Sequence, residues 1–251
     1  MSGHSKWSTI KRAKGLTDIK RGQTFTKLSN VVTIAVKLGG SGDPDANPRL
    51  RMAIDEARSV NMPKENIQRA IERGLGKGEG SNLEEVLYEG FGPESAAIIV
   101  EGVTDNKMRT TSLVKNVFEK NGGNMAGVGA VSYMFQRAGE IKVSSKGGTK
   151  DDEMLELIDL GAKDVEDILE DNVQKYLVYT EGSELNTMGN KITQLGYGVE
   201  SQELVYKPTI TVEIKDKEAA EKLFNFIEKL EELEDVQKVW TNANFDESFV
   251  N

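Results

Sequence analysis

A glycine-rich segment at residues 74–82, GLGKGEGSN, divides this chain into two parts with different hydrophobic patterns. Before it, apolar residues recur every three or four positions, which is the spacing of amphipathic helices. After it, short apolar runs typical of strands alternate with helical patterns. The segment itself has no periodic apolar residues, so we interpret it as a linker. These patterns predict an α+β protein in which an all-helical N-terminal domain precedes mixed domains.

The N-terminal part predicts a three-helix domain over residues 18–78. Its helices are expected at residues 18–38, 48–60 and 63–74. Asn47 is a suitable N-cap for the second helix, and Pro48 suits its first position. Each helix has one apolar stripe, so the three can share a core.

The rest of the chain predicts two mixed domains. Residues 136–207 contain strands at 140–143, 164–169, 175–180 and 198–206 and helices at 151–160 and 185–195, in the order βαββαβ of a ferredoxin-like domain. Strands at 86–91, 96–103 and 131–135 with a helix at 105–120 precede it, and strands at 209–214 and 236–241 with a helix at 217–233 follow it. We expect the flanking parts, residues 79–135 and 208–251, to form a second ferredoxin-like βαββαβ domain that the first interrupts. The alternative is a linear arrangement in which the tail packs beside its neighbour in sequence.

Charge is distributed unevenly along the chain. The first 77 residues carry 15 Lys and Arg against 7 Asp and Glu, a net charge of +8, whereas the whole chain has −9. Such polarity predicts that the two parts face different partners. Residues 1–17 have few core-forming side chains, chiefly Trp7, Ile10 and Leu16, so we expect a basic mobile arm there that an anionic partner orders.

Composition excludes most familiar enzyme chemistries. The chain has no Cys and a single His, His4. Disulfides, thiolate nucleophiles and sulfur-ligated metals are therefore excluded, and a histidine-based metal site or triad is not expected. Carboxylate and Mg²⁺ chemistry or a Ser–Lys pair would survive, but no carboxylate cluster stands out. We expect a non-enzymatic protein without metal or cofactor. With no long apolar run, we also expect a cytoplasmic protein with no membrane segment.

Nucleic acid is the partner that the basic residues favour. Cations interleaved with an aromatic residue can hold phosphates while the ring stacks on unpaired bases. A second group lies at a predicted strand-to-helix turn, where backbone N–H groups and cations can grip a phosphate. The candidate binding residues are His4, Lys6, Trp7, Lys11, Arg12, Lys14, Lys20, Arg21, Lys27, Arg49, Arg51, Asn106, Lys107 and Arg109. As alternatives, Trp7 pins the arm to the helical core, and the turn after residue 104 is a capped helix with a solvated face.

Three other motifs resemble ligand loops and fail on detail. Asp43, Asp45 and Asn47 are spaced like calcium ligands, but Pro48 and Ile54 stand where the loop needs Gly and Glu. The run GGNMAGVG at 122–129 lacks a phosphate-loop Lys and leads from a helix to a strand, so we interpret it as a helix stop and turn, with a binding loop as the alternative. At residues 146–149, KGGT precedes a first turn already filled with carboxylates, and Thr149 is better read as a cap.

Several ordered blocks resemble the YebC/PmpR family. They include MSGHSKW at the start, NPRLR at 47–51, NMP at 61–63, YEGFGP at 88–93 and TDN at 104–106 with Arg109 and Thr110. The resemblance covers essentially the whole chain. It implies an all-helical N-terminal domain and two α+β domains. Members of the family are generally labelled probable transcriptional regulators with DNA binding, whereas mitochondrial and some bacterial relatives are described as translation factors that help ribosomes through difficult sequences.

The leading hypothesis is therefore a cytoplasmic, nucleic-acid-binding regulator of gene expression that acts on DNA. A ribosome-associated translation factor that binds ribosomal or transfer RNA is the main alternative. A helix-turn-helix reading would use Lys64, Asn66, Gln68 and Arg69 on the third helix, but Glu65 and Glu72 share that helix. A ligand-sensing α+β protein is the lesser alternative.

Overall fold

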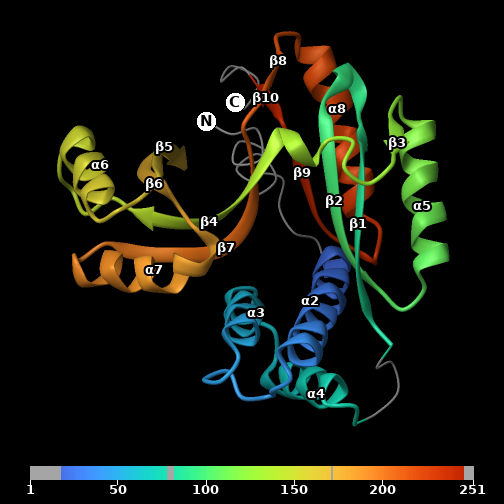
Figure 1. Ribbon diagram of the computed structural model, residues 1–251, viewed down its shortest axis with the longest axis horizontal. Coiled ribbons are helices and arrows are strands. Elements are labelled where there is room, and N and C mark those ends of the chain that lie inside the picture. Colours follow the sequence, from blue (N-terminus) through green and yellow to red (C-terminus); the bar gives the residue numbers. More distant parts are fainter. Residues whose placement is uncertain (1–17, 78–81, 171, 246–251) are drawn as a thin grey trace.

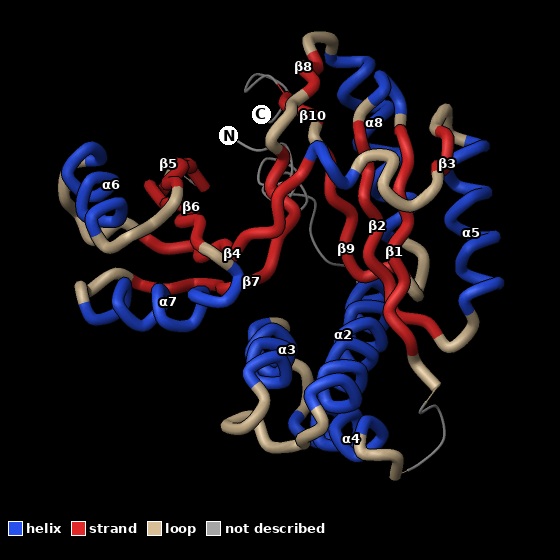
Figure 2. The backbone as a smooth tube through the Cα atoms, viewed as in Figure 1, coloured by secondary structure: helices blue, strands red, loops and turns tan. Residues whose placement is uncertain are grey.

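The computed structural model describes residues 18–77, 82–170 and 172–245, and for residues 18–21 it describes the backbone alone. The predicted arm, residues 1–17, lies outside the described residues. The chain forms three parts (Figure 1): a helical domain, a sheet covered by α5 and α8, and a second sheet covered by α6 and α7 that projects to one side. The tube in Figure 2 shows how the strands of the two sheets cluster while the N-terminal part is helical. The predicted α+β class is confirmed.

The helical domain contains α2 (Asp18–Gly39), α3 (Pro48–Ser59) and α4 (Lys64–Gly74), close to the predicted ranges. Asn47 caps α3, since its Oδ1 accepts a hydrogen bond from the Leu50 N–H at 3.1 Å. Its Nδ2 donates to Ala35 O at 3.0 Å and so ties the cap to α2. Gly39 makes this contact possible, because a Cβ there would lie 2.2 Å from Asn47 Nδ2. Asp43 Oδ1 accepts from the Asp45 N–H at 2.9 Å, as in a turn that leads into a capped helix.

The inserted domain has the predicted ferredoxin-like order. Its elements are β4 (Phe135–Ser144), α6 (Lys150–Asp159), β5 (Asp164–Glu170), β6 (Val173–Thr180), a short 3₁₀ turn η3 (Gly182–Glu184), α7 (Leu185–Gln194) and β7 (Gly198–Pro208). The sheet order is β5-β6-β4-β7, and all pairs are antiparallel. The ladder between β4 and β7 begins at the pair Phe135 and Pro208. The domain boundaries at 135/136 and 207/208, which remain a proposal, therefore fall at the first rung of this ladder.

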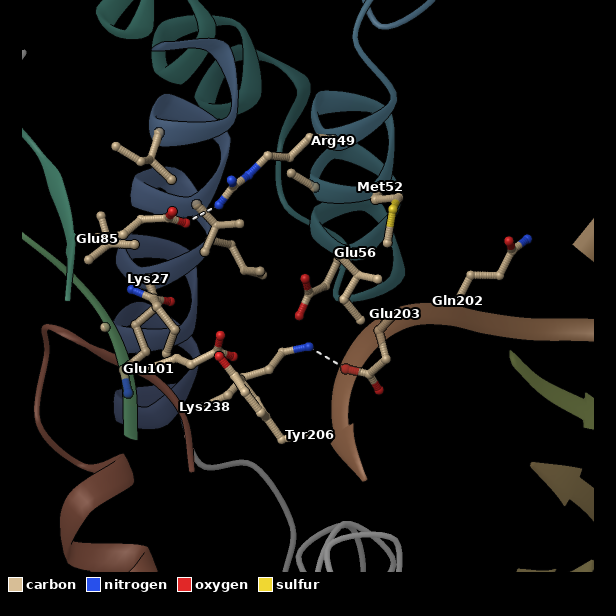
Figure 3. Close-up of a pocket in the computed structure, with 18 of the residues that line it drawn as sticks. Lys27, Arg49, Met52, Glu56, Glu85, Glu101, Gln202, Glu203, Tyr206 and Lys238 are labelled. Atoms are coloured by element: carbon tan, nitrogen blue, oxygen red, sulfur yellow. Dashed lines mark hydrogen bonds and ion pairs between the residues drawn. The ribbon is translucent and has the colours of Figure 1, made fainter. Parts of the chain in front are cut away.

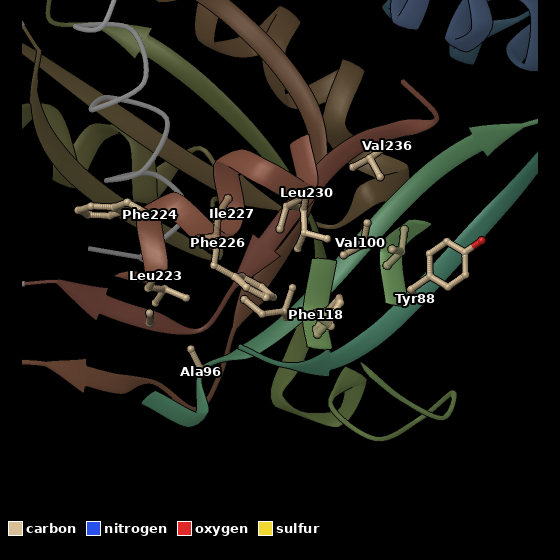
Figure 4. Close-up of a cluster of buried hydrophobic side chains, with 14 of the residues drawn as sticks. Tyr88, Ala96, Val100, Phe118, Leu223, Phe224, Phe226, Ile227, Leu230 and Val236 are labelled. Carbon is tan, nitrogen blue, oxygen red and sulfur yellow. The ribbon is translucent and has the colours of Figure 1, made fainter. Parts of the chain in front are cut away.

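The discontinuous domain is assembled from both sides of the insertion. It contains β1 (Glu84–Phe91), η1 (Pro93–Ser95), β2 (Ala97–Thr104), α5 (Lys107–Lys120), β3 (Asn124–Ala126) and η2 (Ser132–Met134), then β8 (Val212–Ile214), α8 (Lys217–Glu231), β9 (Val236–Thr241) and β10 (Ala243–Phe245). Its main sheet has the order β3-β1-β2-β9. β9 pairs antiparallel with β2, so the tail completes a sheet begun before the insertion. Both α5 and α8 cover one face of that sheet (Figure 4), where Phe118 meets Phe226 edge to face with ring centroids 5.1 Å apart.

One strand of this domain differs from the expectation. The tail strand β8 does not enter the main sheet but pairs in parallel with β10, and β1 holds the place beside β2. β1 and β2 pair along their whole length, from Glu84 with Thr104 to Phe91 with Ala97. A hairpin of neighbours in sequence costs less chain entropy than pairing with a strand more than one hundred residues away, which explains why β1 has this place.

The predicted strand at 131–135 is wrong for most of its length. Residues Ser132–Met134 form the 3₁₀ turn η2, and the strand that follows α5 is the shorter β3 at Asn124–Ala126. The backbone N–H groups of Val131 and Ser132 bind the carboxylate of Glu89 and so are not available to a ladder. Val131 is fully buried, which accounts for the apolar pattern that suggested a strand.

The helix-free faces of the two sheets face each other. Ala97, Ile99 and Trp240 of the discontinuous domain belong to one buried cluster with residues of the inserted domain. The contributing residues of the inserted domain are Phe135, Ala138, Ile168, Leu177, Tyr179 and Val205. This shared cluster fixes the two mixed domains relative to each other.

Candidate nucleic-acid interface

The cations of the helical domain have different roles, and a first group binds the neighbouring domain. Lys27 on α2 donates to the backbone oxygen of Glu231 at the end of α8. Lys37 donates to Leu83 O at 2.9 Å, just before β1. Arg49 at the start of α3 pairs with Glu85 on β1. Of the predicted nucleic-acid-binding residues, Lys27 and Arg49 therefore serve contacts between domains.

The second group faces outward on α3 and α4. Arg51, Arg58, Lys64 and Arg69 are all exposed. Arg51 and Arg58 make only loose contacts with neighbouring acids, at 3.3 Å from Asp45 and 3.4 Å from Asp55. Exposed pairs of this kind are weak and leave the cations accessible to phosphate. This outer face is the described part of the candidate interface.

Arg73 belongs to neither group, because it holds the helical core together. Its Nε donates to Thr33 Oγ1 at 3.0 Å, and its guanidinium also donates to Ser29 Oγ at 2.8 Å. Burial lowers the pKa of the Arg73 guanidinium below its usual value. It links α4 to α2 and is not a candidate for binding phosphate.

Several of the α4 side chains proposed to contact base edges already form hydrogen bonds within their own helix. Gln68 Nε2 donates to Glu72 Oε1 at 3.1 Å, and Arg69 donates to Asn66 Oδ1 at 2.5 Å and to Glu65 O at 3.3 Å. These contacts lie along a single helix, so a base edge would have to replace them. Lys64 is exposed at the helix start.

The predicted turn at Asn106, Lys107 and Arg109 has a structural role. Asn106 caps α5, so the helix begins two residues later than the predicted start at 105: the Asn106 Oδ1 accepts from the Arg109 N–H at 3.1 Å. The Arg109 guanidinium reaches Asp105 at 2.8 Å and Asp235 at 2.9 Å. Hydrogen bonding with Asp235 is the main cause of the raised pKa of Arg109.

The same turn also holds the carboxylate of Asp235 through its hydroxyl groups. Thr110 Oγ1 lies 2.6 Å from Asp235 Oδ2 and 2.8 Å from Thr104 Oγ1. The TDN…RT motif therefore locks the loop before β9 onto β2 and α5. Lys107 is exposed, but its two predicted companions already have intramolecular partners.

Both glycine-rich loops of the mixed domains are filled by the chain's own carboxylates. Glu89 on β1 accepts hydrogen bonds from the N–H groups of Gly129, Val131 and Ser132 at 2.9, 2.8 and 2.9 Å. Burial raises the pKa of Glu89, but these backbone hydrogen bonds outweigh it and lower the pKa below 4.5. The N–H groups that would cradle a phosphate are thus occupied, so the turn interpretation is supported.

The loop at residues 146–149 repeats this arrangement around Glu153 of α6. The carboxylate accepts from the N–H groups of Lys146 and Gly148 at 3.0 and 2.9 Å, and from Tyr176 Oη at 2.8 Å. Its pKa is also lowered, since hydrogen bonds outweigh the opposing effect of burial. Thr149 caps α6 as predicted, with its Oγ1 accepting from the Asp152 N–H at 3.3 Å. Glu89 was not identified from the sequence, where its only local signal is a Glu that directly follows the apolar residues of β1. Glu153 was identified only as one of the carboxylates in the first turn of α6.

A large cleft of about 1070 Å³ lies where the three domains meet (Figure 3). Parts of α2 and α3 form one wall, and β1, β2, β7, β9 and the end of α8 form the others. Met52 of α3 and Tyr206 of β7 are among its apolar lining residues. Its carboxylates are Glu56, Glu85, Glu101, Glu203, Glu228, Glu231 and Glu232, and its cations are Lys27, Arg49, Arg137 and Lys238.

Charged pairs also form inside this cleft. Lys238 pairs with Glu203 (Figure 3), and Trp240 Nε1 donates to Glu101 Oε2 at 2.9 Å. Burial opposes the charge of Lys238, but nearby carboxylates, Glu203 above all, raise its pKa. An excess of carboxylates makes this cleft unsuited to phosphate, so a nucleic acid is expected at the outer face instead.

Within residues 18–77, 82–170 and 172–245, no group of three or more His, Cys, Asp or Glu side chains is placed to hold a metal ion. None of the helices in those ranges is both long and apolar enough to cross a membrane.

The fold and the surface define a class of protein: a three-domain α+β protein whose basic helical domain is attached to two acidic mixed domains. Residues 5–77 match the model of the TACO1/YebC protein N-terminal domain, and residues 83–243 match that of the TACO1/YebC second and third domain. The chain belongs to the TACO1/YebC family, as its sequence motifs predicted.

Similar proteins span the same length. A protein of Persephonella marina named probable transcriptional regulatory protein is 47% identical over 242 residues, which cover 96% of this chain and 95% of that one. One of the same name from Aquifex aeolicus is 42% identical, with 100% and 98% covered. A crystal structure of a conserved hypothetical protein from Aquifex aeolicus superposes with a TM-score of 0.81 at 41% identity, covering 92% of this chain and 93% of the other.

Proposed function

We propose that this protein is a non-enzymatic, nucleic-acid-binding regulator of gene expression that acts on DNA in the cytoplasm. The main support is the outward basic face of α3 and α4, which belongs to the same domain as the arm. Residues 1–17 contain Lys6, Lys11, Arg12 and Lys14 and no Asp or Glu. The names of its relatives as probable transcriptional regulatory proteins agree with a regulatory role.

Phosphate contacts by the arm and the outer face predict a strong dependence on salt. Cations that neutralise phosphates release counterions, so affinity falls as the salt concentration rises. With about four contacts, the affinity for a duplex is expected to fall about 150-fold between 50 and 200 mM salt, and that for a single strand about 50-fold. For a given number of contacts, the size of the fall therefore depends on the type of polymer.

The test neutralises the arm in the full chain with Lys11→Gln, Arg12→Gln and Lys14→Gln. We expect a loss of affinity of at least about tenfold at 100 mM salt, measured by fluorescence anisotropy with labelled duplex DNA and with single-stranded RNA. The matched control replaces three exposed lysines of the mixed domains, Lys120, Lys191 and Lys217, with Gln. Equal losses in both triple variants would contradict a specific role for the arm.

Binding to RNA on the ribosome is the second candidate. It is favoured by α4, where Gln68 and Arg69 already have partners on their own helix and so do not present a free set of readers to a major groove. Irregular RNA is recognised by shape, stacking and phosphate contacts, which need no such helix. Sedimentation of cell lysate through a gradient at low and high salt separates the two candidates. Salt-sensitive comigration with ribosomes that is lost in the arm variant would replace the DNA proposal with the RNA one.

A further inference from the structure

The cleft between the three domains opens beside the point where the arm joins the described chain. α2 begins at Asp18, and Gln23, Thr24 and Lys27 in its next turns line the cleft. Asp18 and Gln23 are about 7.5 Å apart along a helix axis. A segment of 17 residues spans up to about 55 Å when extended, so the arm is long enough to reach every wall of the cleft.

The cleft and the arm have opposite charges. Carboxylates outnumber cations in the cleft by seven to four. Residues 1–17 have four cations and no acid. Glu56 and Glu232 at the cleft are exposed, and among the described residues neither forms an ion pair.

The apolar side chains also match. Leu28 and Val31 of α2, Met52 of α3 and Leu204 and Tyr206 of β7 line the cleft. Of these, Leu204 is 46% exposed and so offers apolar surface to an occupant of the cleft. Trp7, Ile10 and Leu16 of the arm are large apolar side chains that can cover this surface while the intervening cations meet the carboxylates.

We propose that residues 1–17 dock in this cleft in the free protein, and that a nucleic acid must displace them before the arm can bind phosphate. The second half of this statement rests on the proposed function, whereas the docking does not. The contact is self-inhibitory: the acidic cleft competes with phosphate for the same cations. Exposed ion pairs are individually weak and screened by salt, so the contact is reversible and a polyanion can replace it.

The docking is tested in the full chain by a spin label. Because the chain has no Cys, the single substitution Ser8→Cys gives one labelling position in the arm. We expect the label to broaden the methyl NMR signal of Met52, which lines the cleft. The signal of Met108, which is 84% exposed on α5 away from the cleft, is the internal reference and should stay sharp. Neutralising Lys11, Arg12 and Lys14 as above should restore the Met52 signal.

Two outcomes of this measurement would overturn the docking. One is a sharp Met52 signal in the labelled chain at low salt. The other is broadening of Met52 in an unlabelled copy mixed with labelled protein, because the arm of a second copy would then occupy the cleft. Broadened Met52 in a protein that binds no nucleic acid would contradict the proposed function and leave the docking established.

The competition is tested by neutralising the cleft with Glu56→Gln, Glu228→Gln and Glu232→Gln. We expect the affinity for the nucleic acid to rise about threefold to tenfold, because each lost carboxylate removes one weak competitor for the arm. The control, Glu119→Gln, Glu221→Gln and Glu234→Gln, removes three exposed carboxylates that do not line the cleft and should change affinity less than about twofold. In a chain whose arm is already neutralised, the cleft substitutions should have no more effect than this control. An equal rise in that chain would show general repulsion of the polyanion and overturn the competition.

Discussion

The helical domain and the mixed domains use their charged residues in opposite ways. In the helical domain, Lys27, Lys37 and Arg49 bind the next domain, and Arg73 holds α4 to α2. Arg51, Arg58, Lys64 and Arg69 are exposed. In the mixed domains, two buried carboxylates have a structural role: Glu89 and Glu153 are each 2% exposed and hold glycine-rich loops by their backbone N–H groups. The net charge of a domain therefore does not tell which of its charged side chains are accessible to a partner.

The difference also separates two kinds of anion site. The loops that resemble phosphate loops in sequence already hold an anion, which is a carboxylate of the same chain. Their N–H groups already donate hydrogen bonds to that carboxylate, and these hydrogen bonds stabilise the fold. The exposed cations of the outer face, such as Arg51 and Arg58, have only exposed acidic partners among the described residues. Any external phosphate is therefore expected at the helical domain.

The largest predicted effect concerns the buried carboxylate of the first loop. Glu89→Gln removes the charge from three backbone hydrogen bonds in a buried place and should lower the free energy of unfolding by about 3 kcal/mol. Glu84→Gln, an exposed position on the same strand, should change it by less than about 0.5 kcal/mol. Chemical denaturation of both variants checks this. Equal stability of the two would remove the distinction between buried and surface charge.

The substitution Glu89→Gln should also change how the free energy of unfolding depends on pH under acidic conditions. Its pKa in the folded protein is lower than 4.5, so its contribution is complete above that pH and is lost as the pH falls further. The stability of Glu89→Gln should thus fall less steeply below pH 4.5 than that of the unaltered protein. Identical slopes would mean that the carboxylate is not held as described.

Arg73 is a cation of the helical domain whose partners lie inside that domain. Arg73→Met removes hydrogen bonds to Ser29 and Thr33 and should destabilise the helical domain by about 2 kcal/mol. Arg69→Met on the same helix changes an exposed arginine and should cost less than about 0.5 kcal/mol. Thermal unfolding followed by circular dichroism measures both. A larger effect at Arg69 would contradict the division into internal and outward cations.

Glu140 is predicted to destabilise the fold at neutral pH, unlike Glu89. Burial and the neighbouring Glu203 raise its pKa to about 7. The folded state therefore binds more protons than the unfolded state between pH 4.5 and 7, and stability falls as the pH rises through this window. Glu140→Gln should be more stable than the unaltered protein by up to about 2 kcal/mol at pH 8, with a smaller gain at pH 5.

The measurement for Glu140 is urea denaturation at both pH values. Glu213→Gln on β8, an exposed position, is the control and should change the free energy of unfolding by less than about 0.5 kcal/mol. A gain for Glu140→Gln that is the same at pH 5 and pH 8 would contradict the raised pKa.

The smallest effect is expected at the interface between the helical and discontinuous domains. Arg49→Gln breaks an exposed pair with Glu85, in which the two side chains are 48% and 46% exposed, and should cost about 0.5 kcal/mol or less. Its affinity for nucleic acid should be unchanged, whereas Arg51→Gln on the outer face should weaken binding about twofold to fivefold at 100 mM salt. Anisotropy titrations measure both. Equal losses of affinity in the two variants would show that Arg49 also contacts phosphate.

Most elements of this fold were predictable from the sequence, because their apolar spacing and caps are local. The capped helix after Asn47 and the βαββαβ order of the inserted domain follow from such signals. The strand placed at 131–135 was wrong because its apolar residues are buried in a turn held by Glu89, a residue some forty positions away in sequence. β8 was assigned to the wrong sheet for a similar reason, since pairing between distant strands leaves no mark in a local pattern.

The candidate site was predictable only as a list of cations. The sequence identified Lys27, Arg49 and Arg109 as basic residues in the right domains, but not their partners Glu231, Glu85 and Asp235. His4, Lys6, Trp7, Lys11, Arg12 and Lys14 lie outside the described residues, and for Lys20 and Arg21 the backbone alone is described. Arg51 is the predicted residue of the helical domain that the structure places on the outer face. The roles of these residues in binding remain predictions.

The sequence by itself determined the class of the fold, the family, the opposite charges of the two parts and the absence of cysteine chemistry. All of these follow from composition and from patterns within about ten residues. Only the tertiary structure decided which charged side chains have partners inside the molecule. It also decided that carboxylates bind both glycine-rich loops and that an acidic cleft lies between the three domains. The physical reason is that a charge acts according to its distance from partners and from water, and folding sets both distances between residues far apart in the chain.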